Sequence, residues 1–144
     1  IILAGRKLND NMGNHVAMEL TNKMKKKNIQ IKGAKILIMG LTFKENCADL
    51  RNSGIQNVIT ELKKLECSLD LQDPWADKDE VKKIYDIYPT LKPNQNIYDA
   101  VLIAVTHNKF KTLGLLNIKD LCKKTHVIYD LKNLFNSNQV DLKL

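Results

Sequence analysis

The sequence Gly33-Ala34-Lys35-Ile36-Leu37-Ile38-Met39-Gly40 decides the fold class, because it places four apolar residues in a row between two glycines. A short apolar run bounded by turn residues is typical of a strand that is buried on both faces, as in a parallel sheet. The run from Ala100 to Val105, which reads Ala-Val-Leu-Ile-Ala-Val, is a second and stronger example. We therefore expect both segments to be central strands of a parallel sheet.

Helical and strand patterns alternate around these two runs. The further predicted elements are a helix from Leu8 to about Lys27, a helix with a Ser53–Gln56 capping box and a buried face ending at Leu65, a strand from Cys67 to Leu71, a helix capped by Asp77 and bearing Val81 and Ile84, a helix opening at Asn117, and a strand at Val127–Tyr129. Such alternation implies right-handed crossovers and a sheet covered on both faces. The predicted fold is α/β: a Rossmann-like doubly wound parallel sheet, preceded by an N-terminal helix that stands partly apart.

The composition is that of an ordinary globular domain. Of 144 residues, 44% are hydrophobic and 27% are charged, which excludes a disordered or fibrous chain. No apolar run approaches the roughly 18 residues of a membrane-spanning helix, so no membrane association is expected. Three scattered cysteines, Cys47, Cys67 and Cys122, fit neither a disulfide framework nor a metal site and favour a cytoplasmic location. The chain begins at Ile1 rather than Met, which we interpret as the edge of a longer protein.

The formal net charge of +7 invites comparison with nucleic-acid-binding proteins. Among the 23 basic residues, however, only Arg6 and Arg51 are arginines, and aromatic residues make up 6% of the chain. Specific recognition of phosphates and bases relies on arginine forks and on stacking aromatics. We therefore expect a solvated lysine-rich surface and no nucleic-acid partner.

A ligand site is expected beyond the carboxyl ends of the strands, where the strand order reverses. The predicted loops at that edge are residues 41–52, 73–77, 106–110 and 130–133. The first loop lacks a Gly-x-Gly-x-x-Gly pattern, so a dinucleotide-binding turn is not expected there. Lys44 beside a helix N-terminus can hold a phosphate, and Phe43 offers a stacking surface. Two interpretations stay open: a nucleotide or phosphate site, or a loop that merely covers the sheet.

Residues 40–53 read Gly-Leu-Thr-Phe-Lys-Glu-Asn-Cys-Ala-Asp-Leu-Arg-Asn-Ser. This stretch resembles the C-terminal, UDP-binding domain of the UDP-glucose/GDP-mannose dehydrogenase family, whose pattern is a strand, Gly-Leu-x-Phe-Lys, a spacer, Asp-x-Arg and a Ser-led helix. Further matching pieces are Arg6 to Asn9, Asp10, Met12, Asp73-Pro74, Asp99-Ala100 and Tyr129-Asp130. Residues 4–13 and the spacer 45–47 look most like the bacterial UDP-N-acetylhexosamine 6-dehydrogenases of surface-polysaccharide synthesis.

The resemblance implies that the whole protein oxidises the C6 alcohol of a UDP-sugar to a carboxylate, in two hydride transfers to NAD. In the family, the NAD fingerprint and the catalytic cysteine belong to the part that precedes this domain, and the Gly-Gly-x-Cys context of that cysteine surrounds none of the three cysteines here. The fragment is therefore expected to bind the UDP part of the substrate and to be inactive alone. The resemblance also implies a homodimer, with residues 1–30 as the end of a dimerisation helix and residues 31–144 as the UDP-sugar-binding domain.

The site roles are carried over from the resemblance residue by residue. Phe43 and Lys44 match substrate contacts of the family, with Lys44 as the cation. Arg51 matches the arginine that reaches the NAD bound on the other domain. Lys132 stands where UDP-glucose dehydrogenases have an arginine that contacts substrate. His15 lies near a helix position that faces the partner subunit's site.

A different class of function is a non-catalytic α/β interaction module, whose leading helix dimerises without any ligand. The placement of Lys44 and Arg51 discriminates between the two hypotheses. If both side chains point into one cleft, a substrate site is favoured, whereas separate solvated faces count against it. His107 and His126 are interpreted as loop and strand-edge residues, without the spacing of metal ligands.

Overall fold

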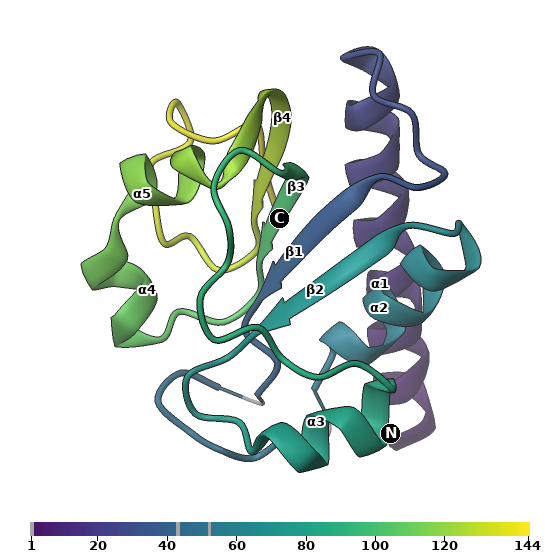
Figure 1. Ribbon diagram of the computed structural model, residues 1–144. Helices are drawn as coiled ribbons and strands as arrows, with labels where there is room; N and C mark the ends of the chain where they lie inside the picture. Colours follow the sequence, from purple (N-terminus) through teal and green to yellow (C-terminus); the bar gives the residue numbers. More distant parts are fainter. Residues whose placement is uncertain (1, 43, 52) are drawn as a thin grey trace.

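The computed structural model describes residues 2–42, 44–51 and 53–144, with the side chains of the first helix described from Met12 onward. Its centre is an all-parallel, five-stranded sheet in the order β2-β1-β3-β4-β5 (Figure 1). The strands are β1 (Lys35–Met39), β2 (Ser68–Gln72), β3 (Tyr98–Ile103), β4 (Cys122–Asp130) and β5 (Leu142–Lys143). The helices are α1 (Ile2–Lys26), α2 (Ile55–Lys64), α3 (Lys78–Tyr85), α4 (Asn108–Leu113) and α5 (Leu115–Asp120). The predicted fold class, with its N-terminal helix, is confirmed.

The sheet is buried on both faces, as the continuous apolar runs predict. Ile36 and Ile38 of β1 belong to a hydrophobic cluster shared with α1, α2 and α3. Leu37 and Met39 belong to a second cluster, shared with α4 and α5. Because successive side chains of a strand point to opposite faces, these two clusters lie on opposite sides of the sheet. Figure 1 shows α1 and α2 on one side and α4 and α5 on the other.

The helix α1 begins earlier than predicted, and its C-terminal half belongs to the core. Val16 and Leu20 are buried in the cluster that α2 and the sheet share. The backbones of α1 and α2 approach closely at Gly13, where an added Cβ would lie 2.5 Å from the Cβ of Asn57 in α2. The prediction that the helix stands partly apart is therefore wrong for this half. The functional division at residue 30 stays a prediction.

Two predicted helix starts have different outcomes. Asp77 caps α3 as expected, since its Oδ1 accepts hydrogen bonds from the N–H groups of Asp79 (2.9 Å) and Glu80 (3.0 Å). In contrast, α2 begins at Ile55 with Gly54 as its N-cap. Gly54 has no side chain to accept a hydrogen bond, so the predicted capping box does not start this helix.

Several other boundaries differ from the prediction. The sequence pattern predicts neither α4 nor the two-residue β5, and α5 begins at Leu115 rather than Asn117. β4 begins at Cys122 rather than Val127. The earlier start was missed because most of the first half of the strand is exposed and lacks an apolar run. Leu65, which was expected to end the buried face of α2, is the C-cap of that helix and is 43% exposed.

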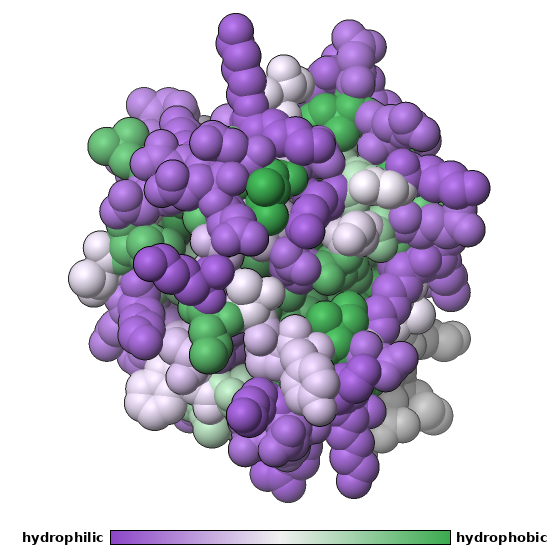
Figure 2. Space-filling view, in the orientation of Figure 1, coloured by the Kyte–Doolittle hydropathy of each residue, from purple (hydrophilic) through white to green (hydrophobic). Residues whose placement is uncertain are grey.

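The surface is largely polar. Polar side chains cover most of the face seen in Figure 2, and apolar residues show between them in small areas. Among the helices that the structure describes, none combines the length and apolar character needed to cross a membrane.

Candidate functional site

The strand order reverses direction between β1 and β3, and this point organises the site. β1 leads into α2 on one face, whereas β3 leads into α4 on the other, so the two loops diverge. At the divergence, Gly40 has a φ of +103°, and a Cβ there would lie 2.6 Å from both the Cβ and the backbone N of Val105. Glycine is required at position 40 because the backbone segments after β1 and β3 are in contact there.

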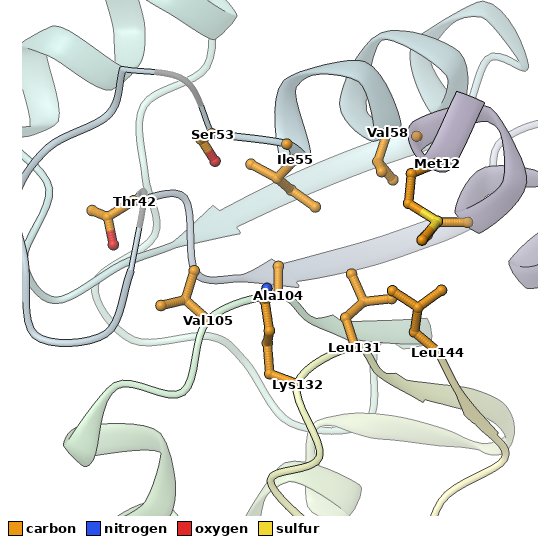
Figure 3. Close-up of a pocket in the computed structure, with 13 residues that line it drawn as sticks. Met12, Thr42, Ser53, Ile55, Val58, Ala104, Val105, Leu131, Lys132 and Leu144 are labelled. Carbon is orange, nitrogen blue, oxygen red and sulfur yellow. The ribbon is translucent and has the colours of Figure 1, made fainter. Parts of the chain in front are cut away.

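A cavity of about 360 Å³ opens beside this point, between α1, the start of α2 and the loops after β3 and β4 (Figure 3). Its walls are formed by Met12, Gly13, Val16, Thr42, Ser53, Gly54, Ile55, Val58, Ala104, Val105, Leu131, Lys132 and Leu144. Apolar side chains dominate this lining, and among the described residues Lys132 is the one with a charged side chain. A mostly apolar pocket with a few polar groups is the usual form of a small-molecule site.

Asp73 joins the loop after β1 to the loop after β2. Its Oδ2 accepts hydrogen bonds from the N–H groups of Leu41 (2.7 Å) and Thr42 (3.2 Å). Its Oδ1 accepts from the N–H groups of Trp75 (2.8 Å) and Ala76 (3.1 Å). The buried carboxylate therefore fixes the start of the loop that leads to Lys44.

His107 completes this network from the loop after β3. Its side chain is fully buried, and its Nε2 lies 3.0 Å from Asp73 Oδ2 and 3.1 Å from Thr42 Oγ1. Its Nδ1 accepts a hydrogen bond from the N–H of Asn46 at 2.9 Å. Because an amide can only donate, Nδ1 carries no proton, and the proton of the ring lies on Nε2. His107 lies in a loop, as predicted, but its hydrogen bonds in this network were not predicted.

The environment of Asp73 lowers its pKa from the ordinary value of 3.8. Burial is the largest influence and acts to raise the pKa, since it penalises the charged form. The hydrogen bond from His107 and those from the backbone N–H groups of Leu41 and Trp75 outweigh it. The carboxylate is therefore the favoured form, and it accepts all of these donors.

The loop that carries Lys132 is fixed in a similar way. Asp130, the buried last residue of β4, accepts hydrogen bonds from the N–H of Lys132 (Oδ1, 3.2 Å) and of Phe135 (Oδ2, 2.8 Å). These bonds fold the backbone back over the end of the strand. The Lys132 side chain then extends to the wall of the cavity (Figure 3).

The structure brings only part of the predicted site together. Lys132 lines the cavity, but Lys44 and Arg51 are exposed and are absent from the described lining. The Arg51 side chain is 86% exposed and forms a bidentate pair with Asp49, with Nε–Oδ1 at 3.0 Å and Nη2–Oδ2 at 3.1 Å. The side-chain hydrogen bond from Arg51 is the main cause of a lowered pKa at Asp49. Lys44 and Arg51 therefore do not point into one cleft, and their placement counts against a substrate site that they share.

The remaining predicted residues contribute less to the geometry. His15 is exposed on α1, and Phe43 lies outside the described residues. Within the described part of the chain, no group of His, Cys, Asp or Glu side chains has the arrangement of a metal site.

Comparison with known proteins connects this geometry to a family. The model of the UDP binding domain of the UDP-glucose/GDP-mannose dehydrogenase family matches residues 37–137. The whole chain is 47% identical to a UDP-N-acetyl-D-glucosamine 6-dehydrogenase of Salmonella typhi and 44% identical to one of Pseudomonas aeruginosa. It covers 34% of each, so the chain spans about a third of the length of these relatives.

Solved structures share the fold. An NDP-N-acetyl-D-galactosaminuronic acid dehydrogenase from Methanosarcina mazei Go1 aligns with a TM-score of 0.73 at 22% identity, over 95% of this chain and 28% of that one. The UDP-N-acetyl-mannosamine dehydrogenase Cap5O from Staphylococcus aureus aligns with a TM-score of 0.70 at 24% identity, over 96% of this chain and 31% of that one. At these identities the likeness extends to the arrangement of the elements.

Proposed function

The chain belongs to the UDP-glucose/GDP-mannose dehydrogenase family, and we propose that its cavity beside the β1–β3 divergence binds the UDP part of a UDP-sugar. The observation that carries the proposal is the position of Lys132. It places an ammonium group at a mostly apolar cavity beyond the carboxyl ends of the strands. That edge of the sheet is where doubly wound folds bind nucleotides.

The walls of the cavity suit the two halves of a nucleotide. Val58, Leu131 and the neighbouring apolar side chains offer a surface for the base and ribose. The diphosphate would lie near Lys132 and the first turn of α2, where Gly54 and Ile55 line the cavity. The first N–H groups of a helix have no partner within the helix and attract anions.

For the whole protein, we propose an NAD-dependent UDP-sugar 6-dehydrogenase acting on a UDP-N-acetylhexosamine. The relatives that match the full length of the chain are UDP-N-acetyl-D-glucosamine 6-dehydrogenases, which supports this choice. We propose that the catalytic cysteine and most of the NAD site belong to the rest of the protein. The 144-residue chain alone is then expected to form no NADH from UDP-sugars.

The residues after β1 do not fit a dinucleotide. NAD, when bound, accepts the hydride that leaves the sugar carbon, and its pyrophosphate needs a glycine-rich turn to lie against. Here the turn continues from Gly40 into Leu41 and Thr42, and the space over Gly40 is filled by Val105. Arg51 is the candidate for a contact with NAD held by another domain, since its exposed guanidinium can pair with a phosphate.

We also propose that α1 contributes to a homodimer. His15 and Met18 lie three residues apart on the helix, so they share one face, and both are exposed. The Met18 side chain is 56% exposed, although it is large and apolar. A substitution of Met18 by Lys is expected to shift a dimer to monomer in sedimentation experiments on the full-length protein.

The UDP proposal is tested by titrating UDP into the ¹⁵N-labelled chain and following its amide shifts. We expect shifts at the described cavity residues and in the loop 44–54. The variant Lys132→Ala should bind about ten- to a hundredfold more weakly, because a charge-assisted hydrogen bond contributes roughly 1.5–3 kcal/mol. Lys44→Ala tests the carried-over contact in the same way.

The matched control is Lys124→Ala, an exposed lysine in the first half of β4, away from the carboxyl ends of the strands. It should bind UDP like the wild type. If UDP shifts scattered lysines equally in all variants, the attraction is general electrostatics and the proposal is wrong. If no amide shifts at all, the interaction-module hypothesis gains instead.

A further inference from the structure

Hydrogen bonds join the loop after β3 to Thr42, Glu45 and Asn46 in the loop after β1. The Asn46 N–H donates to His107 Nδ1 at 2.9 Å, and the Asn46 Oδ1 accepts from the N–H of Asn108 at 3.1 Å. Further along, the Thr106 hydroxyl donates to Glu45 Oε2 at 3.4 Å. These bonds cross the divergence between β1 and β3, beyond the last backbone hydrogen bond between the two segments, from Ala104 N–H to the Met39 carbonyl oxygen at 2.8 Å.

A continuous chain of hydrogen bonds leads from His107 to the backbone of Lys44. Nε2 lies 3.1 Å from Thr42 Oγ1, and the Thr42 hydroxyl donates to the Lys44 carbonyl oxygen at 3.0 Å. Since the Thr42 hydroxyl donates its hydrogen bond to the Lys44 carbonyl oxygen, its own oxygen accepts a hydrogen bond from the Nε2–H of the imidazole. The backbone around Lys44 is therefore held on both sides, by Thr42 before it and by Asn46 after it.

Both ring nitrogens of His107 are used, and the ring is fully buried. Packing alone does not account for a histidine here, since an apolar side chain fills space without the cost of burying polar atoms. The ring connects loops that are distant in sequence: Asp73 is 34 residues away and Asn46 is 61. An imidazole can do this because it offers a donor and an acceptor on opposite sides of a rigid ring.

We propose that His107 is a positioning residue of the loop after β1, which starts at the cavity wall with Thr42: its Nδ1 holds that loop at Asn46, and so raises the affinity of the cavity for UDP. This inference rests on the proposed UDP-binding function. His107 does not itself line the described cavity, so it acts through Thr42 and Asn46.

Two substitutions separate the two ring nitrogens. In His107→Asn, the amide oxygen takes the place of Nδ1 and can still accept from Asn46, but the donor to Asp73 is lost. In His107→Gln, the amide nitrogen takes the place of Nε2 and can still donate to Asp73, but Asn46 loses its acceptor. The matched control is His126→Gln, at a half-buried histidine in β4 whose Nδ1 lies 2.8 Å from the carbonyl oxygen of Lys123.

Three quantities are measured on the 144-residue chain: hydrogen exchange of the Asn46 amide without ligand, the dissociation constant for UDP, and the melting temperature. In His107→Gln we expect faster Asn46 exchange and roughly three- to tenfold weaker UDP binding, the effect of losing one neutral hydrogen bond. In His107→Asn we expect both to return toward wild type, even where the melting temperature falls further. The control should leave all three quantities unchanged.

A merely structural role gives a different result, in which UDP affinity follows the melting temperature in both variants without rescue by asparagine. That result, or unchanged Asn46 exchange in His107→Gln, overturns the proposal. If wild type shows no UDP binding, the proposed function fails, while the exchange measurement still decides whether His107 orders the loop.

If neither histidine variant folds, Thr42→Val provides a second test. It keeps the side-chain volume and breaks the chain from His107 to the Lys44 carbonyl, whereas Thr42→Ser keeps the hydroxyl. We expect faster hydrogen exchange of the Asn46 amide in Thr42→Val than in Thr42→Ser. Equal exchange rates in these two variants would contradict the proposal.

Discussion

The substitution Asp73→Asn tests the network that organises the site, because it removes one charge and one acceptor oxygen while keeping the side-chain shape. Asp73 is 7% exposed and accepts hydrogen bonds on both of its oxygens. Leu41, Thr42 and His107 lie at Oδ2, and two further amides lie at Oδ1. An asparagine has one oxygen, so whichever way it turns, its NH₂ group faces donors that it cannot satisfy.

The expected loss of stability follows from the smaller of the two sets of donors, which is the pair of amides at Oδ1. Orienting the asparagine oxygen toward Leu41, Thr42 and His107 leaves the N–H groups of Trp75 and Ala76 against an NH₂. A buried donor without a partner costs about 1–3 kcal/mol, and the bonds that survive lose their charge assistance. We therefore expect the free energy of unfolding to fall by about 2–4 kcal/mol at pH 7. For a chain of this length, this corresponds to a melting temperature lower by about 6–16 °C.

The loss should depend on pH in a defined direction. The folded-state pKa of Asp73 is lowered from 3.8, so its contribution is fully present above the unfolded value and is lost as the pH falls through the folded value. The difference between wild type and Asp73→Asn should therefore be constant from pH 7 to about 5. It should narrow below about pH 4, where the carboxylate of the wild type takes up a proton.

Urea unfolding followed by circular dichroism at pH 7, 5, 4 and 3 measures this difference directly. Asp120→Asn, at an exposed position in α5, is the control and should change the free energy of unfolding by less than about 0.5 kcal/mol. A loss at Asp73 no larger than that of the control, or a loss that persists undiminished at pH 3, would refute the reasoning.

Three further substitutions test particular contacts. Gly40→Ala should destabilise the chain by about 2–4 kcal/mol in urea unfolding, since its Cβ would meet the backbone N of Val105 at 2.6 Å, and Val105→Ala should not rescue it. Asp77→Ala should cost about 1 kcal/mol through loss of the α3 cap, and Asp77→Asn should cost much less; equal losses would contradict the capping role. Leu20→Ala should cost about 3–5 kcal/mol in a single cooperative transition, whereas Met18→Ala should be nearly neutral; a separate early transition would show that α1 folds apart from the sheet.

The fold was predictable where burial leaves a continuous apolar run. Residues 36–39 and 100–105 are such runs. The first lies within β1, and residues 100–103 of the second lie in β3, which ends at Ile103. β4 was predicted only in its second half, because its first half is mostly exposed and carries Lys123 and Lys124. β5 has two residues, and it is a strand because Tyr129 of β4 pairs with Leu142. Such a pairing depends on tertiary contact, and no local pattern encodes it.

The position of the cavity was predictable, but the side chains that line it were less so. The rule that ligands bind at the carboxyl ends of parallel strands selected four loops. Two of them, residues 41–52 and 130–133, contribute to the described lining of the cavity, whereas residues 73–77 and 106–110 do not. The rule does not tell where a long side chain ends, because that depends on how the loop backbone is held. Lys132 lines the cavity because Asp130 folds its loop back, whereas Arg51 is turned to Asp49 in the solvent.

The role of His107 was within reach of the same rule. Parallel strands bring their carboxyl ends to one edge, so polar residues that follow different strands become neighbours, however distant they are in sequence. Among the described residues, the buried polar side chains are those of Thr21, Thr42, Ser53, Asp73, His107 and Asp130. Four of these, at 42, 73, 107 and 130, end a strand or follow its end within a few positions. A histidine that follows the strongest apolar run is therefore expected to lie close to the Asp and Thr that follow the neighbouring strands. Its two ring nitrogens could then be assigned to join the loops that follow neighbouring strands.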